Sequence, residues 1–247
     1  MPDPTPQDHA DAATLAEESG RLLLAIRAGV DAFEPPERIK DEGDRRSHEL
    51  LMARLHETHP GDAVLSEEGA DDQARLGAER VWIVDPLDGT REFGEPPRTD
   101  WAVHVALVID GTPVAGAVAL PARGLVLSTA NPPRLQPPAE RIRLVVSRTR
   151  PPAITAALQE ALDAELVPMG SAGAKAMAVV LGDADVYAHA GGQYEWDSAA
   201  PVAVATAAGL HCSRLDGSPL VYNRPNPWLP DLLICRPELV DRVRKAL

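Results

Sequence analysis

The feature that most constrains this chain is a short apolar run that ends at an acidic turn. Residues 81–84 read Val-Trp-Ile-Val, which predicts a buried strand that ends at Asp85. Pro86 stiffens the following turn, and Asp88 lies three residues beyond Asp85. Such a turn can point both carboxylates into one pocket, with the carbonyl of Leu87 between them. Because Mg²⁺ prefers hard oxygen ligands, the segment predicts a magnesium site at the end of a buried strand.

Gly89 and Thr90 extend this prediction from a cation to an anion. Gly89 lets the backbone approach a ligand closely. If a helix begins here, the amides of both residues lie at its N-terminus, where phosphate binds well. One short segment then holds both the metal ions and a phosphate group.

Three further acidic pieces are candidates for the same site: Asp44, the pair Glu67 and Glu68, and Trp196-Asp197. Each has an ordinary explanation when it is taken alone. A Glu-Glu pair after a strand is usually solvated, and Asp197 can cap the helix that follows it. Residues 86–89 can form a simple β-turn. Only in residues 85–90 do several features, namely a strand end, a stiffened turn and two carboxylates, point to the same site.

The hydrophobic pattern predicts both helices and strands. The expected helices are 13–30, 44–58, 153–162, 171–181, 198–208 and one from Pro237. The expected strands are 63–65, 81–84, 103–108, 114–120, 125–130, 142–146, 165–168, 185–188 and 232–235. Asp110-Gly111 between two of these strands is a strong hairpin signal. The order favours stacked sheets and helices, an α+β or mixed α/β architecture.

Two stretches divide the chain into parts. Residues 1–12 are rich in Pro and Asp and lack the basic start and apolar stretch of a signal peptide, so we expect a disordered leader. Residues 131–139 are rich in proline and are expected to form a linker. The linker separates an N-terminal metal-binding lobe (13–135) from a C-terminal substrate lobe (140–247), and the two lobes form one compact catalytic unit.

Charge and cysteine content exclude several classes of partner. A net charge of −13 argues against a nucleic-acid polymer or an anionic membrane, because both need basic surface. A small phosphorylated substrate stays possible, since bound divalent cations invert the local charge of an acidic cleft. Cys212 and Cys235 have no metal-ligand spacing and are expected to be buried and reduced, which predicts a cytoplasmic location. No apolar run approaches the roughly 20 residues that span a bilayer.

Residues 82–90 resemble the signature of the inositol monophosphatase family, a set of lithium-sensitive, magnesium-dependent sugar and nucleotide phosphatases. The family's second signature, a Trp-Asp that opens a C-terminal helix, is similar to Trp196-Asp197. Its Glu-Glu motif matches residues 67–68, and the resemblance runs in order from about Leu15 to Leu233. It implies a layered α-β-α-β-α sandwich of the sugar phosphatase type, lithium inhibition and a homodimer.

The resemblance also implies a role for each matching residue. Two or three Mg²⁺ ions would be held by Glu67, Asp85, the Leu87 carbonyl, Asp88 and Asp197. Asp44, Thr90 and Glu67 would be catalytic, with Asp44 and Thr90 positioning and activating the attacking water. The amides of Gly89 and Thr90 would hold the phosphate. Two metal ions can stabilise the attacking and leaving oxygens of an in-line displacement, so we expect direct attack by water without a phosphorylated enzyme.

Four short sequence motifs outside the metal site resemble motifs of the CysQ-like subfamily, which acts on 3′-phosphoadenosine 5′-phosphate (PAP). They are Glu92-Phe93 after the first signature, Val-Ser-Arg-Thr at 146–149, Gly170-Ser171 followed by Lys175, and residues 217–223. Arg148 and Lys175 would bind the second phosphate of PAP, with Arg91 as a further cation. Ser147, Ser171 and Tyr222 would contact ribose or base. Arg148 as a surface charge and Tyr222 as loop packing are the ordinary alternatives.

One departure from the family lies before Asp44. The family has a longer loop with a Val-Thr-x-Ala-Asp motif, whereas residues 39–44 here are shorter and lack that Thr. This loop helps to close the site and to hold a third metal ion. The sequence therefore leaves open whether a third ion binds, and whether Asp41 or Asp44 activates the water. Glu68 is a further candidate beside the metal ligands.

The leading hypothesis is a magnesium-dependent 3′(2′),5′-bisphosphate nucleotidase that converts PAP to AMP, an activity linked to sulfate assimilation. The alternative is an inositol monophosphatase or fructose-1,6-bisphosphatase of broad specificity, favoured if the basic residues lie far from the cleft. A non-catalytic metal- or nucleotide-binding regulator is the third hypothesis. Loss of the catalytic carboxylates would favour it, but all of them are present.

Overall fold

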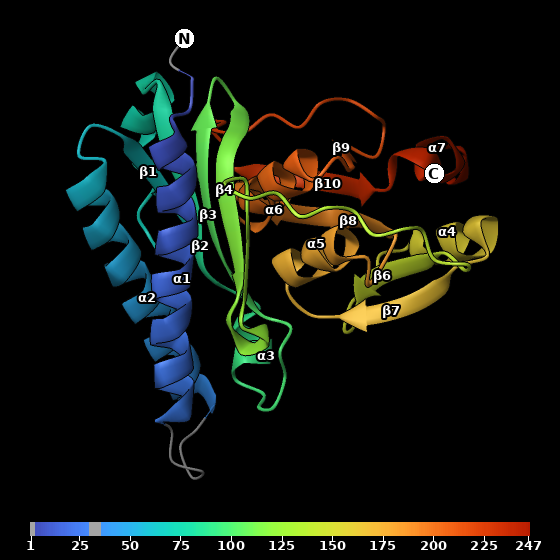
Figure 1. Cartoon of the computed structure of the whole chain (residues 1–247), viewed down its shortest axis with the longest axis horizontal. Helices are drawn as coiled ribbons and strands as arrows, with labels where there is room; N and C mark the ends of the chain where they lie inside the picture. The colour runs from blue at the N-terminus through green and yellow to red at the C-terminus, as the bar shows by residue number, and fades with distance from the viewer. Residues whose placement is uncertain (1–2, 30–35) are drawn as a thin grey trace.

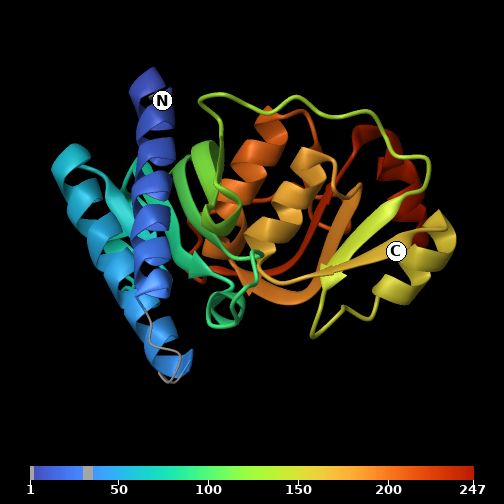
Figure 2. The ribbon, with the colours of Figure 1, turned by 60° about the horizontal axis from the view of Figure 1, so that its bottom comes forward.

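The computed structural model describes residues 3–29 and 36–247 and shows five stacked layers (Figure 1). Two long helices cover the outer face of a first sheet, two helices lie between the sheets, and two short helices cover the outer face of a second sheet (Figure 2). In that order they are α1 (Pro6–Ala28), α2 (Pro36–Thr58), α5 (Ala172–Leu181), α6 (Glu195–Ala207), α4 (Thr155–Leu162) and α7 (Val240–Ala246). The predicted α-β-α-β-α sandwich is confirmed.

The first sheet has the order β1-β2-β3-β4-β5, with β1 parallel to β2 and the other pairs antiparallel. The predicted hairpin at Asp110-Gly111 joins the third and fourth strands, and both residues have positive φ (48° and 71°), as a tight two-residue turn requires. The strands are β1 (Ala63–Ser66), β2 (Arg80–Asp88), β3 (Ala102–Ile109), β4 (Thr112–Leu120) and β5 (Leu125–Ser128).

The second sheet has the order β7-β6-β8-β10-β9, parallel across its first three strands and antiparallel across the rest. Its strands are β6 (Arg143–Ser147), β7 (Glu165–Met169), β8 (Val186–Tyr194), β9 (His211–Ser213) and β10 (Trp228–Cys235). Short helical turns are η1 (Gln73–Gly77), α3 (Thr90–Phe93), η2 (Pro121–Arg123) and η3 (Pro237–Leu239).

The layer between the sheets is built from small side chains. α5 and α6 carry many alanines, and most of their residues are buried. A Cβ added at Gly116 on β4 would lie 3.0 Å from the Ala203 Cβ on α6, so this strand and this helix approach closely because both present small groups. This close approach brings residues from both halves of the chain to one site.

The N-terminus differs from its prediction. The disordered leader expected over 1–12 is wrong from residue 6, because α1 begins at Pro6. Thr5 and Asp8 form a reciprocal capping box, and proline at the first helical position is already shaped for a helix. The buried Asp8 carboxylate also accepts a 2.6 Å hydrogen bond from Arg80. The predicted end of this helix at Val30 lies outside the described residues.

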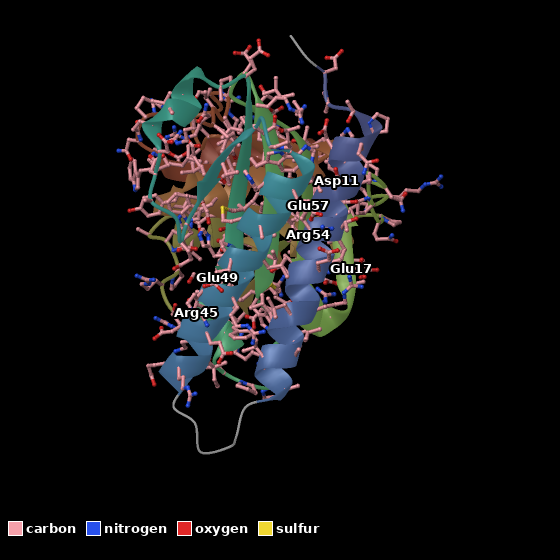
Figure 3. The ribbon with its side chains drawn as sticks, turned by 90° about the vertical axis from the view of Figure 1, so that its left-hand side faces the viewer. Asp11, Glu17, Arg45, Glu49, Arg54 and Glu57 are labelled. Carbon is pink, nitrogen blue, oxygen red and sulfur yellow. The ribbon has the colours of Figure 1, made fainter. Side chains whose placement is uncertain are left out.

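α2 is longer than predicted at its start. It begins at Pro36, so residues 39–44, which were expected to be a shortened loop, are helical. Its solvent face carries ion pairs such as Arg45–Glu49 and Arg54–Glu57, which Figure 3 shows on the outside of the helix. The opposite face packs inward at Gly43, where an added Cβ would lie 3.1 Å from the Leu87 side chain. Asp44 therefore reaches the acidic turn from a rigid helix.

Two smaller predictions concern the cysteines and membranes. Cys212 and Cys235 are both free thiols; Cys235 is buried as expected, whereas Cys212 is only half-buried. Among residues 3–29 and 36–247, no helix has both the length and the apolar character that crossing a bilayer requires.

Candidate active site

The acidic turn is part of a strand. β2 was expected to end at Asp85, but it continues to Asp88 because the chain bulges between these residues and then pairs again, Asp88 with Ala102. The Leu87 amide donates a 3.0 Å hydrogen bond to Asp85. Ser47 on α2 donates a 2.6 Å hydrogen bond to the Pro86 carbonyl. The bulge is therefore fixed from both sides.

Three carboxylates meet at this bulge. One oxygen from each of Asp85, Asp88 and Asp197, three of the residues that the family resemblance implied as metal ligands, lies within 4.8 Å of the others. Asp197 also accepts a 2.7 Å hydrogen bond from the Tyr194 amide, so it caps α6 as well. Burial and neighbouring negative charge raise the pKa of Asp85 well above its usual range, and burial raises the pKa of Asp197 to about 6. Converging carboxylates of this kind, two buried and one half-buried, fit a divalent cation.

Asp88 differs from Asp85 and Asp197 because several hydrogen-bond donors surround its carboxylate. It accepts hydrogen bonds from the Ser171 hydroxyl (2.5 Å), the Ala172 amide (3.1 Å) and the Gly173 amide (2.6 Å) at the start of α5. Burial alone would raise the pKa of Asp88, but the charges of His104 and Lys175 and the Ser171 hydroxyl outweigh it and lower this pKa to about 2. Asp88 therefore joins the two halves of the molecule as a carboxylate that stays ionised.

His104 on β3 is a contact that the sequence did not suggest. Its side chain is fully buried, its Nδ1 lies 2.9 Å from the Trp196 carbonyl, and its Nε2 lies 3.2 Å from the Asp88 carboxylate. Burial alone would lower the pKa of His104, but the charge of Asp88 outweighs this and raises it. A histidine in the middle of an apolar strand gives no signal of its own, because the carboxylate that it contacts comes from another strand.

Glu67 lies beside the three-carboxylate group. It follows β1 and shares a hydrogen bond with Asp85. The Glu67 side chain is exposed at the cavity wall, and partial desolvation of its carboxyl together with the charge of Asp197 raises its pKa to about 7. Glu68 is exposed, and its negative charge acts on Asp44.

Asp44 and Thr90 lie together, as the resemblance implied. The Thr90 hydroxyl is 3.4 Å from the Asp44 carboxylate and 3.1 Å from the Leu87 carbonyl. Burial and the charge of Glu68 raise the pKa of Asp44 to about 7. Gly89 precedes α3 with a φ of 84°, a conformation that glycine adopts without strain. An acid of this pKa can exchange a proton near neutral pH.

A cavity of about 730 Å³ opens from this cluster. Its volume falls within the range of sites for small organic ligands. The predicted residues on its wall are Glu67, Asp88, Gly89, Thr90, Ser147, Ser171, Lys175 and Asp197. The wall continues beyond them to residues 189–194 and Trp228, which sequence reasoning did not single out.

The predicted substrate cations separate into two groups. Lys175 is buried on the cavity wall, its Nζ donates a 2.7 Å hydrogen bond to the Ser171 carbonyl, and burial lowers its pKa. Arg148 is not on the wall, because its guanidinium pairs with Glu92 and Glu95, at 2.7 Å each. Arg91 and Arg150 also line the cavity. Arg150 was not predicted.

Two predicted substrate contacts have structural partners instead. The Ser171 hydroxyl accepts from the Ala174 amide and donates to Asp88, so it caps α5 even though it lines the cavity. The expected contact of Tyr222 with ribose or base is wrong, because its side chain is buried and its hydroxyl lies 3.1 Å from Ser198 on α6. The ordinary alternative, packing of the loop, is the one observed.

The layered sandwich brings three carboxylates, from a bulged strand and a central helix, together beside a cavity, an arrangement that fits a metal-dependent phosphatase of the sugar phosphatase type. The chain belongs to the inositol monophosphatase family, whose sequence model matches residues 34–235.

Named relatives cover almost the whole chain. A 3′-phosphoadenosine 5′-phosphate phosphatase of Mycobacterium bovis is 54% identical over 239 residues, which are 93% of this chain and 89% of the relative. The 3′(2′),5′-bisphosphate nucleotidase CysQ of Escherichia coli K12 is 30% identical over 87% of this chain and 94% of its own. The crystal structure of CysQ from Bacteroides thetaiotaomicron superposes with a TM-score of 0.81 at 29% identity, over 93% of this chain and 97% of that one.

Proposed function

We propose that this protein is a magnesium-dependent phosphomonoesterase that removes the 3′-phosphate of PAP and releases AMP. The observation that carries the proposal is the 54% identity, over 93% of the chain, to a protein named for this activity. The cavity supports it, since about 730 Å³ exceeds what a phosphate group alone occupies.

The proposed metal ligands are Asp85, Asp88, Asp197, Glu67 and the Leu87 carbonyl. Bound Mg²⁺ supplies a Lewis acid that polarises the phosphoryl group and lowers the pKa of a bound water. Two or three ions are proposed, and Glu67 beside the main cluster is the residue that extends the site beyond one ion.

The chain's own residues would manage the proton and the phosphate. Asp44 would accept a proton from the attacking water, and the Thr90 hydroxyl, 3.4 Å from its carboxylate, would orient it. The Gly89 and Thr90 amides, on the cavity wall, would bind the phosphate. Water attacks directly, and no phosphorylated enzyme forms. Lys175, with Arg91 and Arg150 at the cavity wall, provides positive charge for the second phosphate.

Inhibition by millimolar lithium, a homodimer, a cytoplasmic location and a place in sulfate assimilation belong to the same proposal. They rest on the family resemblance and, for the location, on the free thiols.

A comparison of three substrates tests the proposal. Turnover of PAP, inositol 1-phosphate and fructose 1,6-bisphosphate is measured at one Mg²⁺ concentration. We expect kcat/KM for PAP to exceed the other two clearly. A preference for inositol 1-phosphate or fructose 1,6-bisphosphate would replace the proposal with the broad sugar phosphatase, which also fits the metal cluster.

A further inference from the structure

Two buried serines meet between the long helices that cover the first sheet. Ser19 on α1 and Ser47 on α2 are both fully buried, and their hydroxyl oxygens lie 2.5 Å apart. The two helices lie side by side over the sheet (Figure 1). A buried hydroxyl is costly unless it is hydrogen-bonded, and alanine is the better helix former at such a position. The pair therefore needs a reason beyond the packing of two helices.

The hydrogen bonds of this pair have a fixed direction. A serine hydroxyl has one proton to donate, and Ser47 donates it over 2.6 Å to the Pro86 carbonyl, which can only accept. Ser19 must therefore be the donor in its 2.5 Å contact with Ser47. In such a chain each bond polarises and strengthens the next. The chain leads from α1 through α2 to the bulge of β2.

The peptide unit between Pro86 and Leu87 continues the chain to a proposed metal ligand. Its carbonyl accepts from Ser47, and its amide donates a 3.0 Å hydrogen bond to the Asp85 carboxylate. A peptide unit is planar, so fixing its oxygen also fixes the direction of its N–H. Ser47 thereby determines how the Leu87 amide holds Asp85, which belongs to the three-carboxylate group.

Packing sets the distance between Ser47 and the bulge. Gly43 lies one helical turn before Ser47 on the same face of α2, and a Cβ added there would lie 3.1 Å from the Leu87 side chain and 2.9 Å from Phe93. The helix backbone thus lies directly against the bulge. Ser47 does not line the cavity, so its influence on the reaction has to pass through the bulge.

We propose that Ser47, supported by Ser19, is a positioning residue that orients the 86–87 peptide and thereby holds Asp85 in the geometry that binds Mg²⁺. This role rests on the proposed function, because it requires a bound metal ion. Loss of a group that orients a metal ligand typically weakens metal binding about 10- to 100-fold. Ser47 acts on Asp85 through a peptide unit, so we expect an effect at the low end of this range.

Ser47→Ala tests the role by metal binding rather than by turnover. Calorimetric titration of the metal-free protein should show a Kd for Mg²⁺ raised about 10-fold. With Mg²⁺ at 100 times the parent's Kd, the rise in Tm should be about half that of the parent, because stabilisation follows the logarithm of 1 + [Mg²⁺]/Kd. Saturating Mg²⁺ should restore kcat to within about threefold of the parent with an unchanged KM for PAP, since Asp85 itself is still present.

Ser213→Ala is the matched control for the loss of a buried hydroxyl. Ser213 on β9 is 3% exposed, its hydroxyl donates a 2.7 Å hydrogen bond to the Arg214 carbonyl and lies 3.0 Å from His211, and it does not line the cavity. The control variant should have a lower Tm in EDTA but the parent's Kd for Mg²⁺ and the full Mg²⁺-induced rise in Tm. Ser47→Thr keeps the hydroxyl and should bring the Kd back to within about threefold of the parent.

The order of the chain gives a second, independent test. Ser19→Ala leaves the bond from Ser47 to Pro86 in place, so the Kd for Mg²⁺ should rise only about 2- to 3-fold. The double variant should bind Mg²⁺ no more weakly than Ser47→Ala, because Ser19 acts only through Ser47. Losses that multiply in the double variant would overturn the proposal. Ser19→Ala and Ser47→Thr keep the test available if Ser47→Ala does not fold.

The outcomes separate the positioning role from the proposed function. An unchanged Kd for Mg²⁺ in Ser47→Ala would overturn the positioning role, and so would an equal loss of Mg²⁺ affinity in Ser213→Ala, because the effect would then come from general destabilisation. A parent protein that binds Mg²⁺ but does not hydrolyse PAP would overturn the proposed function alone, since the positioning role is measured by metal binding.

Discussion

Asp85 is the residue on which the charge balance of the site depends most. Its carboxyl is 1% exposed, it shares a hydrogen bond with Glu67, and its pKa is raised by burial and by three negative neighbours, Glu67, Asp88 and Asp197. Buried like charges are unfavourable until a cation neutralises them. The metal-free fold therefore carries a cost at this position that cation binding removes.

Replacing Asp85 with Asn should remove most of the increase in Tm that Mg²⁺ binding gives the parent protein. In the parent protein, Mg²⁺ at 100 times its Kd should raise Tm by about 5–10 °C, since binding at this ratio adds about 2.7 kcal/mol. Asp85→Asn should show a rise of less than about 2 °C, keep its fold and lose activity. Asp110 is an exposed turn residue, so Asp110→Asn is the control; it should keep both the Mg²⁺-induced rise in Tm and the activity. A full Mg²⁺ response in Asp85→Asn would contradict the ligand assignment.

Asp44 predicts a pH dependence of the metal-free protein. Its pKa rises from 3.8 to about 7, so the folded state binds this proton more tightly than the unfolded state. The resulting stability is complete below about pH 4 and is lost as pH rises through 7. In EDTA, Tm of the parent should therefore fall more between pH 4.5 and 8 than Tm of Asp44→Asn. We expect a difference of about 2–4 °C, kept small by solvent screening. Parallel curves would show that the carboxyl is not perturbed.

The sequence predicts single residues well where a local pattern carries them. The end of the predicted strand indicated Asp85 and Asp88, and the start of the predicted helix indicated Asp197; all three are found at the cluster. His104 and Ser47 could not be predicted, because what matters is the partner that each meets after folding. The sequence assigned Arg148 to the substrate because its partner in the fold could not be recognised. That partner, Glu92, lies 56 residues away in the chain.

At the scale of elements, the start of α5 matters most to the site. Its first amides bind Asp88, and it passes close to β3, where a Cβ added at Gly173 would lie 2.0 Å from the His104 Nε2. A helix with a side chain at this position could not approach the metal turn as closely. The glycine thus permits a helix from the second half to hold a ligand from the first.

Gly173→Ala should therefore destabilise the protein. Overpacking against buried His104 is expected to cost about 1–3 kcal/mol, seen as a lower urea midpoint. Gly61→Ala is the matched control, because its added Cβ meets nothing within 4 Å. That variant should stay within about 0.5 kcal/mol of the parent. Equal stability of the two variants would mean that α5 moves away from β3 at little cost.

Element boundaries show where local patterns stop being informative. Buried strands and the hairpin at Asp110-Gly111 follow from hydrophobic runs and turn residues, and they are confirmed. β2 passes through Asp85 and Pro86 because Asp88 pairs again with β3, which a local pattern does not show. β9 was missed, since its three residues form a strand only through pairing with β10.

At the scale of the whole molecule, polar contacts near the cavity rim join the N-terminal sheet to the C-terminal half, in addition to the contacts of Asp88 and His104. One is the pair between Glu92 on α3 and Arg148 after β6, and a second is the Asp100 carboxylate, which accepts a 2.6 Å hydrogen bond from the Gly170 amide. The division into lobes 13–135 and 140–247 stays a prediction; α5 and α6 from the second half pack against the first sheet.

The two acidic partners of Arg148 allow a matched test of this connection. Both lie 2.7 Å from the guanidinium, but the Glu92 side chain is 7% exposed and that of Glu95 is 45% exposed. Glu92→Gln should lower the free energy of unfolding by about 1–2 kcal/mol, because it weakens a buried charged hydrogen bond. Glu95→Gln should cost less than about 0.5 kcal/mol. Urea denaturation measures both, and equal losses would contradict a role for burial.

The product formed from PAP tests the proposed reaction most directly. Purified protein is incubated with PAP in Mg²⁺ or in EDTA, and ³¹P NMR identifies which phosphate leaves. We predict inorganic phosphate and adenosine 5′-phosphate in Mg²⁺, with at least a 100-fold loss of rate in EDTA or in Asp85→Asn, since catalysis then lacks its metal. Release of the 5′-phosphate, or undiminished turnover in EDTA, would contradict a magnesium-dependent 3′-phosphatase.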